Sequence, residues 1–151
     1  MFLLAAATAA LASVAGLGAQ KLTIGERAPE VQAAQWLTDK PAADKARFID
    51  FYHSSSREAE TLLSDMDRYA RDFDGRLTVV VIAREPQDKV QGVLMKDSPK
   101  YKVAIDDDGR TFAAFGVKVV PFGVLTDSKG KVLWFGNPAQ LDAATLDKLL
   151  K

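Results

Sequence analysis

The sequence predicts one α/β domain in which helices flank a central mixed β-sheet. Two short apolar runs that are rich in β-branched and aromatic residues, 48–52 and 77–83, have the composition of strands covered on both faces. Apolar residues at helical spacing follow the first run. Further along, two strand-like runs are joined by a tight turn and followed by a closing helix. Strands and helices that alternate in this way favour an α/β fold.

Composition limits the chemistry more than it limits the fold. The chain has 151 residues, which is enough for one domain with a substantial core. Its 20 basic and 20 acidic side chains cancel, so neither nucleic acid nor an anionic membrane surface is indicated as a partner. Cysteine is absent, which excludes thiol catalysis and thiolate metal ligands. A single histidine excludes a multi-histidine metal site within one chain, and we expect no metal and no cofactor.

The N-terminal segment predicts export. Residues 2–19 carry no charged side chain and consist mostly of Ala, Leu, Val and Gly. The segment is short for a membrane span and is similar to the apolar part of a secretory signal. An uncleaved anchor and an ordinary N-terminal helix are the alternatives. We expect residues 1–19 to be a signal peptide and residues 20–151 to form the domain. The mature protein would then be periplasmic or secreted, without a membrane span.

The first half of the domain is predicted around the strand Arg47–Tyr52. Residues 22–25 before it are expected to form a short edge strand. Three serines, 54–56, break the central strand, and apolar residues then recur at three- and four-residue steps (Ala59, Leu62, Leu63, Met66, Ala70 and Phe73). Ser55 and Glu58 have the spacing of a capping box, which predicts one long helix that begins at or near Ser55. Gly75 is expected to cap its end.

The second half continues the alternation of strands and helices. Strands are predicted over 77–83, 101–105, 117–126 and 131–135, and helices over 88–96, 110–115 and 141–151. Pro121 lies near the start of its strand, where proline is tolerated only at an edge or a first position. The sequence Asp127-Ser-Lys-Gly130 predicts a hairpin turn.

Two acidic features invite a functional interpretation. Asp50 lies inside an apolar strand, where a carboxylate is costly unless it is paired, so we expect it to be half-exposed or salt-bridged. The sequence Asp106-Asp-Asp-Gly109 clusters carboxylates as calcium sites do, but it lacks the length and the terminal glutamate of an EF-hand loop. We expect a solvated turn there.

Several short motifs together resemble the extracytoplasmic TlpA-like and redoxin branch of the thioredoxin-like superfamily. The first is Gly25-Glu-Arg-Ala-Pro29, and the second is the aromatic strand that leads into His53-Ser-Ser-Ser-Arg-Glu-Ala59. The others are Val120-Pro121 and the turn 127–130. The resemblance covers the chain from about Thr23 onward and implies the thioredoxin-like fold, with a cis-proline at Pro121. It places the two positions of the family's Cys-x-x-Cys motif at Ser56 and Ala59.

These two positions lack the family's redox chemistry. Only sulfur supports the mixed-disulfide intermediate, so Ser56 cannot exchange disulfides, and Ala59 offers no resolving group. Dithiol oxidoreductase and thiol peroxidase activity are therefore excluded for this chain. Hydrolysis by Ser56 would need His53 within hydrogen-bonding reach as a base. We expect instead that the serines cap the helix, and we assign no catalytic residue.

A binding function survives the loss of cysteine. The resemblance implies that the loop before the first helix and the loop before Pro121 lie side by side and form a groove for an extended peptide or protein. The residues expected there are Tyr52, His53, Ser56, Val120, Pro121 and Phe122. The first hypothesis is thus an exported, non-catalytic binding protein with a partner in the cell envelope. The alternative is a member of a thiol-disulfide oxidoreductase family, active in cell redox homeostasis, whose cysteines were lost or replaced.

Overall fold

The structure is a computed structural model that describes residues 21–151. Its strands are β1 (Gln35–Trp36), β2 (Ala46–Tyr52), β3 (Leu77–Ala83), β4 (Lys102–Ile105), β5 (Phe122–Thr126) and β6 (Val132–Gly136). Its helices are α1 (Arg57–Thr61), α2 (Leu63–Asp72), α3 (Gln87–Leu94), α4 (Arg110–Ala114) and α5 (Ala143–Leu149), with a short 3-10 helix, η1, over Pro138–Gln140. The predicted signal peptide lies outside the described residues.

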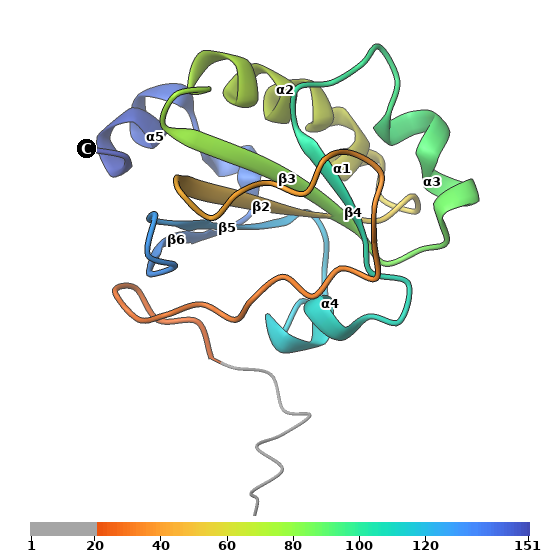
Figure 1. Cartoon of the computed structure of the whole chain (residues 1–151), viewed down its shortest axis with the longest axis horizontal. Helices are drawn as coiled ribbons and strands as arrows, with labels where there is room; N and C mark the ends of the chain where they lie inside the picture. The colour runs from red at the N-terminus through yellow and green to blue at the C-terminus, as the bar shows by residue number, and fades with distance from the viewer. Residues whose placement is uncertain (1–20) are drawn as a thin grey trace, which may run out of the picture.

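One mixed sheet organises the domain. Its six strands lie in the order β1-β4-β3-β2-β5-β6 (Figure 1). The strands β2, β3 and β4 run parallel, whereas β1, β5 and β6 pair antiparallel with their neighbours. All seven residues of β2 pair with β3. This arrangement confirms the predicted α/β class with a central mixed sheet.

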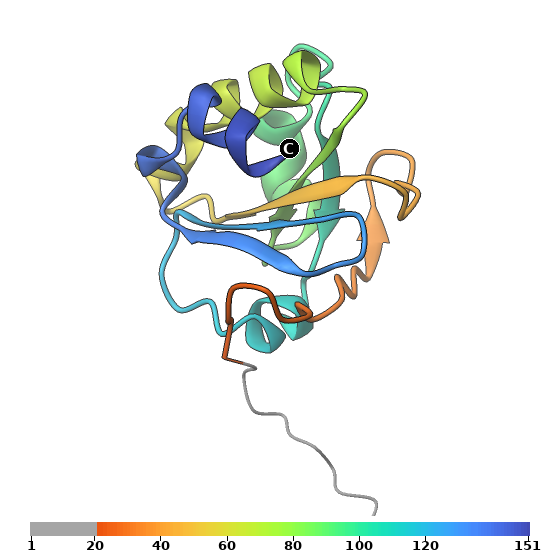
Figure 2. The ribbon, with the colours of Figure 1, turned by 90° about the vertical axis from the view of Figure 1, so that its left-hand side faces the viewer.

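Helices cover both faces of the sheet, and each face has its own core. Figures 1 and 2 show α2 and α5 on one face, with α4 and residues 22–33 on the other. Side chains alternate between the faces along each strand. On β2, Phe48 and Tyr52 therefore join the core beneath α2, while Ile49 and Phe51 join the core beneath α4. Phe51 packs edge-on against Phe112 of α4, with 5.0 Å between the ring centroids.

The close packing of β5 on β2 requires a glycine at position 123. A Cβ atom there would lie 2.6 Å from Cζ of Phe48 and 3.0 Å from Cγ of Pro138. Phe48 is fully buried and stacks on Trp134, with 6.0 Å between ring centroids, so it cannot move aside.

We expect Gly123→Ala to lower the free energy of unfolding by about 1 to 2 kcal/mol, because it overpacks the core. Urea unfolding measures the change. Gly92→Ala on α3 is the control, since a Cβ atom there meets nothing within 4 Å. Equal stability of the two variants would contradict the prediction.

The N-terminal segment differs from the prediction. Residues 22–25 do not form a strand, and the edge strand is β1 instead. The chain nevertheless follows β6 for a short distance, because Gly25 N–H donates to the carbonyl of Val132 and Val132 N–H donates to the carbonyl of Glu26, at 2.8 and 2.9 Å. Gly25 has a φ of +87°, which turns the chain and keeps this pairing short.

The first helix begins near Ser55, as predicted, but its cap differs by one residue and the helix is interrupted. Ser56 is its N-cap, since the Ser56 hydroxyl accepts the N–H of Ala59 at 3.1 Å. The predicted capping box between Ser55 and Glu58 is therefore wrong by one residue. The helix is divided at Leu62 into α1 and α2. Apolar spacing could not reveal this break, because both pieces keep their buried residues on one face.

Two further predictions are corrected by the structure. The stretch 117–121 is irregular, and β5 begins only at Phe122, because Pro121 has no N–H to donate to a ladder. The Val120–Pro121 peptide bond is cis. Asp106 does not lie in a solvated turn. It is fully buried, and its carboxylate accepts the N–H groups of Thr111 and Phe112 at the start of α4.

Candidate functional site

Three loops meet at one edge of the sheet. The strands β2 and β3 are parallel, so their carboxyl ends, Tyr52 and Ala83, lie side by side. The antiparallel strand β5 begins beside the end of β2, where Phe51 pairs with Phe122. The loop 53–56, the loop 84–86 and the stretch 117–121 therefore converge. Ligand sites of open α/β sheets commonly lie at the carboxyl ends of their strands.

The loop 53–56 is closed by the imidazole of His53. The backbone N–H of Ser55 donates to Nδ1 of His53 at 3.1 Å, and the Ser55 hydroxyl lies 2.7 Å from the same nitrogen. The backbone N–H of Ser56 donates to the carbonyl of His53 at 3.0 Å. These contacts form a turn that brings the chain directly into α1, with Ser55 exposed and His53 half-buried.

Ser55, and not Ser56, is the serine whose hydroxyl contacts His53. The Ser56 hydroxyl instead accepts the N–H of Ala59 as a helix cap. The condition that we set for hydrolysis by Ser56 is thus not met by the geometry. Nδ1 of His53 also accepts the Ser55 N–H, so the contact of His53 with Ser55 belongs to the turn that closes the loop.

Glu85 holds this loop against the end of β3. Its carboxylate accepts the backbone N–H of Ser54 at 2.9 Å and also the Ser54 hydroxyl. Nε2 of His53 and Nζ of Lys89 lie 3.6 and 3.5 Å from the same carboxylate. The Glu85 side chain is only 4% exposed, so it is a buried anchor for a half-exposed loop.

The surroundings of Glu85 favour its ionised form. Burial alone would raise the pKa of the carboxyl. The two hydrogen bonds from Ser54, with the nearby imidazole of His53 and the ammonium of Lys89, outweigh burial and hold the pKa of Glu85 below its ordinary value. Glu85 was missed by our sequence analysis, in which residues 84–87 only connect the predicted strand 77–83 to the predicted helix 88–96. The available signal was an acid placed just after the strand that lies parallel to the central one.

A shallow groove runs between the converging loops. Its volume is about 530 Å³. We call "the groove" the cavity lined by His53, Ser55, Ser56, Arg84, Phe112 and residues 117–120. Val119 is 76% exposed and is the most exposed large apolar side chain in the part of the chain that the structure describes. Arg84 and Lys118 are exposed cations on the rim.

The groove contains part of the predicted set of binding residues. His53, Ser56 and Val120 line it. Pro121 and Phe122 follow directly and are half-buried, with the ring of Phe122 6.0 Å from that of Phe51 in the core. Tyr52 is 1% exposed and packs in the opposite core, so its side chain does not reach the groove. The alternation of side chains along β2 places it there.

Asp50 differs from our expectation. It is 1% exposed, and neither carboxylate oxygen has a hydrogen-bond partner among residues 21–151. It is therefore neither half-exposed nor salt-bridged. Burial raises the pKa of Asp50 well above its ordinary value, so the neutral form is favoured.

Among the described residues, no group of three or more His, Asp or Glu side chains is placed to hold a metal ion. Within the same range, no helix is long and apolar enough to cross a membrane.

Comparisons with solved structures identify the architecture. The chain is similar to a thiol:disulfide interchange protein assigned as DsbE from Chlorobium tepidum, with a TM-score of 0.73 and 22% identity over 87% of this chain and 100% of that one. The chain has the thioredoxin-like fold. The thioredoxin domain of a thiol-disulfide oxidoreductase from Bacteroides vulgatus is also similar, with a TM-score of 0.72 and 15% identity over 87% of this chain and 100% of that domain.

A third neighbour comes from outside the cell. It is a secreted disulfide oxidoreductase from Mycobacterium tuberculosis, with a TM-score of 0.59 and 19% identity over 71% of this chain and 81% of that one. No protein-family model and no curated protein matches the sequence. The thioredoxin-like neighbours are named for disulfide chemistry, which requires sulfur, and this chain contains no cysteine. The predicted fold is thus confirmed, together with the absence of the Cys-x-x-Cys motif.

Proposed function

We propose that this protein is an exported, non-catalytic member of the thioredoxin-like proteins that binds an extended peptide or protein segment in the groove. The observation that carries the proposal is the exposure of Val119 beside Val120 and His53 in one cavity. A large apolar side chain that is mostly exposed in the lining of a groove is a common feature of interaction sites.

The backbone beside Val119 supports the same function. Among the described residues, the backbone groups of Lys118, Val119 and Val120 make no hydrogen bond. A partner strand that lies along this stretch would satisfy those groups and would add to the affinity. The loop 53–56 on the opposite side is held firmly by Glu85, so the groove has one fixed wall.

The two cationic side chains at the rim of the groove favour a partner that carries negative charge. Arg84 and Lys118 form no ion pair within residues 21–151, and the nearby carboxylate of Glu85 is buried beneath the loop. An extended segment with an apolar side chain over Val119 and an acidic side chain beside it would match both features. The signal-like segment 2–19 and the secreted neighbour support the proposed export.

A peptide-library selection tests the groove, with Val119→Asp as the disruptive variant. We expect selected peptides to bind Val119→Asp at least about tenfold more weakly, a loss of about 1.4 kcal/mol, because the charge removes the apolar contact and repels an acidic flank. Val93→Asp is the matched control, since Val93 is 38% exposed on α3 outside the groove. Equal affinity for all three proteins would exclude the groove as the binding site.

A further inference from the structure

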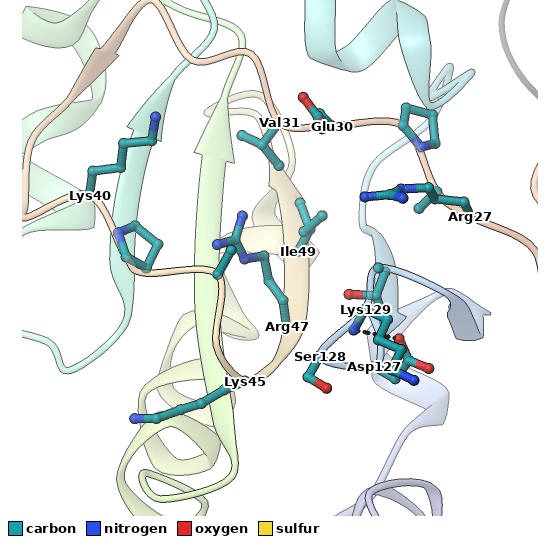
Figure 3. Close-up of a pocket in the computed structure, with 16 residues that line it drawn as sticks. Arg27, Glu30, Val31, Lys40, Lys45, Arg47, Ile49, Asp127, Ser128 and Lys129 are labelled. Atoms are coloured by element: carbon teal, nitrogen blue, oxygen red, sulfur yellow. Dashed lines mark hydrogen bonds between the residues drawn. The ribbon is translucent and has the colours of Figure 1, made fainter.

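A second cavity lies at the opposite end of the central strand from the groove. Three separate segments form it: residues 27–31, residues 40–47 and the turn 126–130 (Figure 3). Its volume is about 420 Å³. Arg47 is the second residue of β2, whereas Tyr52 at the other end leads into the groove. The two cavities are therefore structurally independent.

The second cavity concentrates positive charge in a chain that is neutral overall. The lining contains five cationic side chains (Arg27, Lys40, Lys45, Arg47 and Lys129) against two acidic ones (Glu30 and Asp127). The formal net charge of the whole chain is +0, so this excess is a local feature. We call this cavity "the basic cleft". Figure 3 shows Arg27 and Arg47 extending into it from its two sides, while Lys45 points away.

The acidic residues of the basic cleft do not neutralise Arg47. One carboxylate oxygen of Asp127 accepts the N–H groups of Lys129 and Lys131, both at 2.9 Å, and so closes the turn. The Glu30 side chain points away from Arg47 (Figure 3). Lys45 donates to the carbonyl of Asp74 at 3.1 Å. In the part of the chain that the structure describes, Arg47 forms no ion pair.

Arg47 is also partly removed from water. It is half-buried, and burial lowers the pKa of its guanidinium from the ordinary value. A partly desolvated cation without a carboxylate partner is unfavourable, and an anion bound against it would offset that cost. The planar guanidinium is suited to carboxylate and phosphate groups, which it can bind through two parallel hydrogen bonds.

We infer that the basic cleft binds a small organic anion that carries at least two negative charges on oxygen. Its anionic groups would lie between Arg47, Arg27 and Lys40. Its apolar body would rest on Val31 and Ile49, which form the floor between the cations. A volume of about 420 Å³ suits a ligand of metabolite size. This inference is independent of the groove and of its partner.

Titration with succinate, glycerol phosphate and inorganic phosphate tests the inference, with chloride at matched ionic strength as the control. We expect at least one dianion to bind with a Kd on the order of 1 mM or tighter and to shift the NMR signal of the Arg47 side-chain N–H. Arg47→Gln should weaken binding at least about tenfold, and affinity should fall with added salt. Lys40→Gln is a second variant for the same binding test. Lys40 is exposed, so we expect this substitution to leave the protein folded.

Removal of one cationic side chain outside the basic cleft distinguishes a specific anion-binding site from general electrostatic attraction of anions to the protein. Arg68→Gln on α2 removes one charge from an exposed ion pair with Asp65, away from the basic cleft, and should change the affinity less than about twofold. Equal weakening by Arg47→Gln and Arg68→Gln would overturn the inference. So would the absence of saturable binding by every dianion, or binding only to anionic lipid vesicles.

Discussion

Replacement of Glu85 by alanine should lower the free energy of unfolding by about 3 kcal/mol. The carboxylate accepts two hydrogen bonds from Ser54, and hydrogen bonds to a charged group contribute roughly 1.5 to 3 kcal/mol each. The expected loss lies at the lower end of the summed contribution of these two hydrogen bonds. Ser54 is half-exposed, so water can replace part of the hydrogen bonding that the substitution removes. Urea unfolding at pH 7 measures the effect. A loss below about 0.5 kcal/mol would show that the loop does not depend on Glu85.

The pH dependence of this loss follows from the lowered pKa of Glu85. A carboxyl whose pKa is lower in the folded state contributes stability above its unfolded pKa, and that stability is lost as the pH falls. We therefore expect the difference between the parent protein and Glu85→Gln to be full at neutral pH and to shrink below about pH 4.5, the ordinary pKa. Asp142→Asn is not a suitable control, because its carboxylate also caps a helix. Glu26→Gln is suitable, since Glu26 is exposed and its side chain makes no hydrogen bond or ion pair within residues 21–151.

The central sheet could be predicted because its signals are local. The strands β2 and β3 are apolar runs that need no distant partner to be recognised, and both were placed within about one residue. The edge strand β1 could not be placed in this way. Gln35 and Trp36 are strand residues only because they pair with Ile105 and Ala104, far along the chain. Pairing over such a separation leaves no pattern in the short segment itself.

The site was predictable in position and only partly in detail. The aromatic strand followed by serines located the loop 53–56, but the anchor of that loop, Glu85, comes from a different strand end. Its contact with Ser54 exists because β2 and β3 are parallel neighbours. Tyr52 was placed in the groove from the resemblance alone, whereas alternation along β2 directs it to the core with Phe48. The same alternation also buries Asp50, which lies between them.

Asp50→Val should raise the free energy of unfolding by roughly 2 to 3 kcal/mol at pH 8, because a buried polar group without a partner costs about 1 to 3 kcal/mol and an ionised one costs more. Both carboxylate oxygens of Asp50 lack a hydrogen-bond partner within the described residues. Valine has no polar side-chain atom, favours strands, and at this position would face the same core as Phe48 and Tyr52. Urea unfolding of the two proteins compares them directly. Destabilisation by valine would show that the Asp50 carboxyl forms a favourable interaction in the folded protein.

Asp50→Asn isolates the electrostatic part of this cost. The pKa of Asp50 is raised in the folded state, so between its ordinary value of 3.8 and the folded value the native protein binds more protons than the unfolded chain. Its stability must then fall as the pH rises through that interval. We expect the parent protein to lose stability from pH 4 upward relative to Asp50→Asn, in the direction opposite to the effect of Glu85. Parallel stability curves for the two proteins would mean that Asp50 ionises as readily in the core as in water. Glu85 and Asp50 thus change the pH dependence of stability in opposite directions, since the Glu85 carboxylate accepts hydrogen bonds from Ser54 and the Asp50 carboxyl has no partner within the described residues.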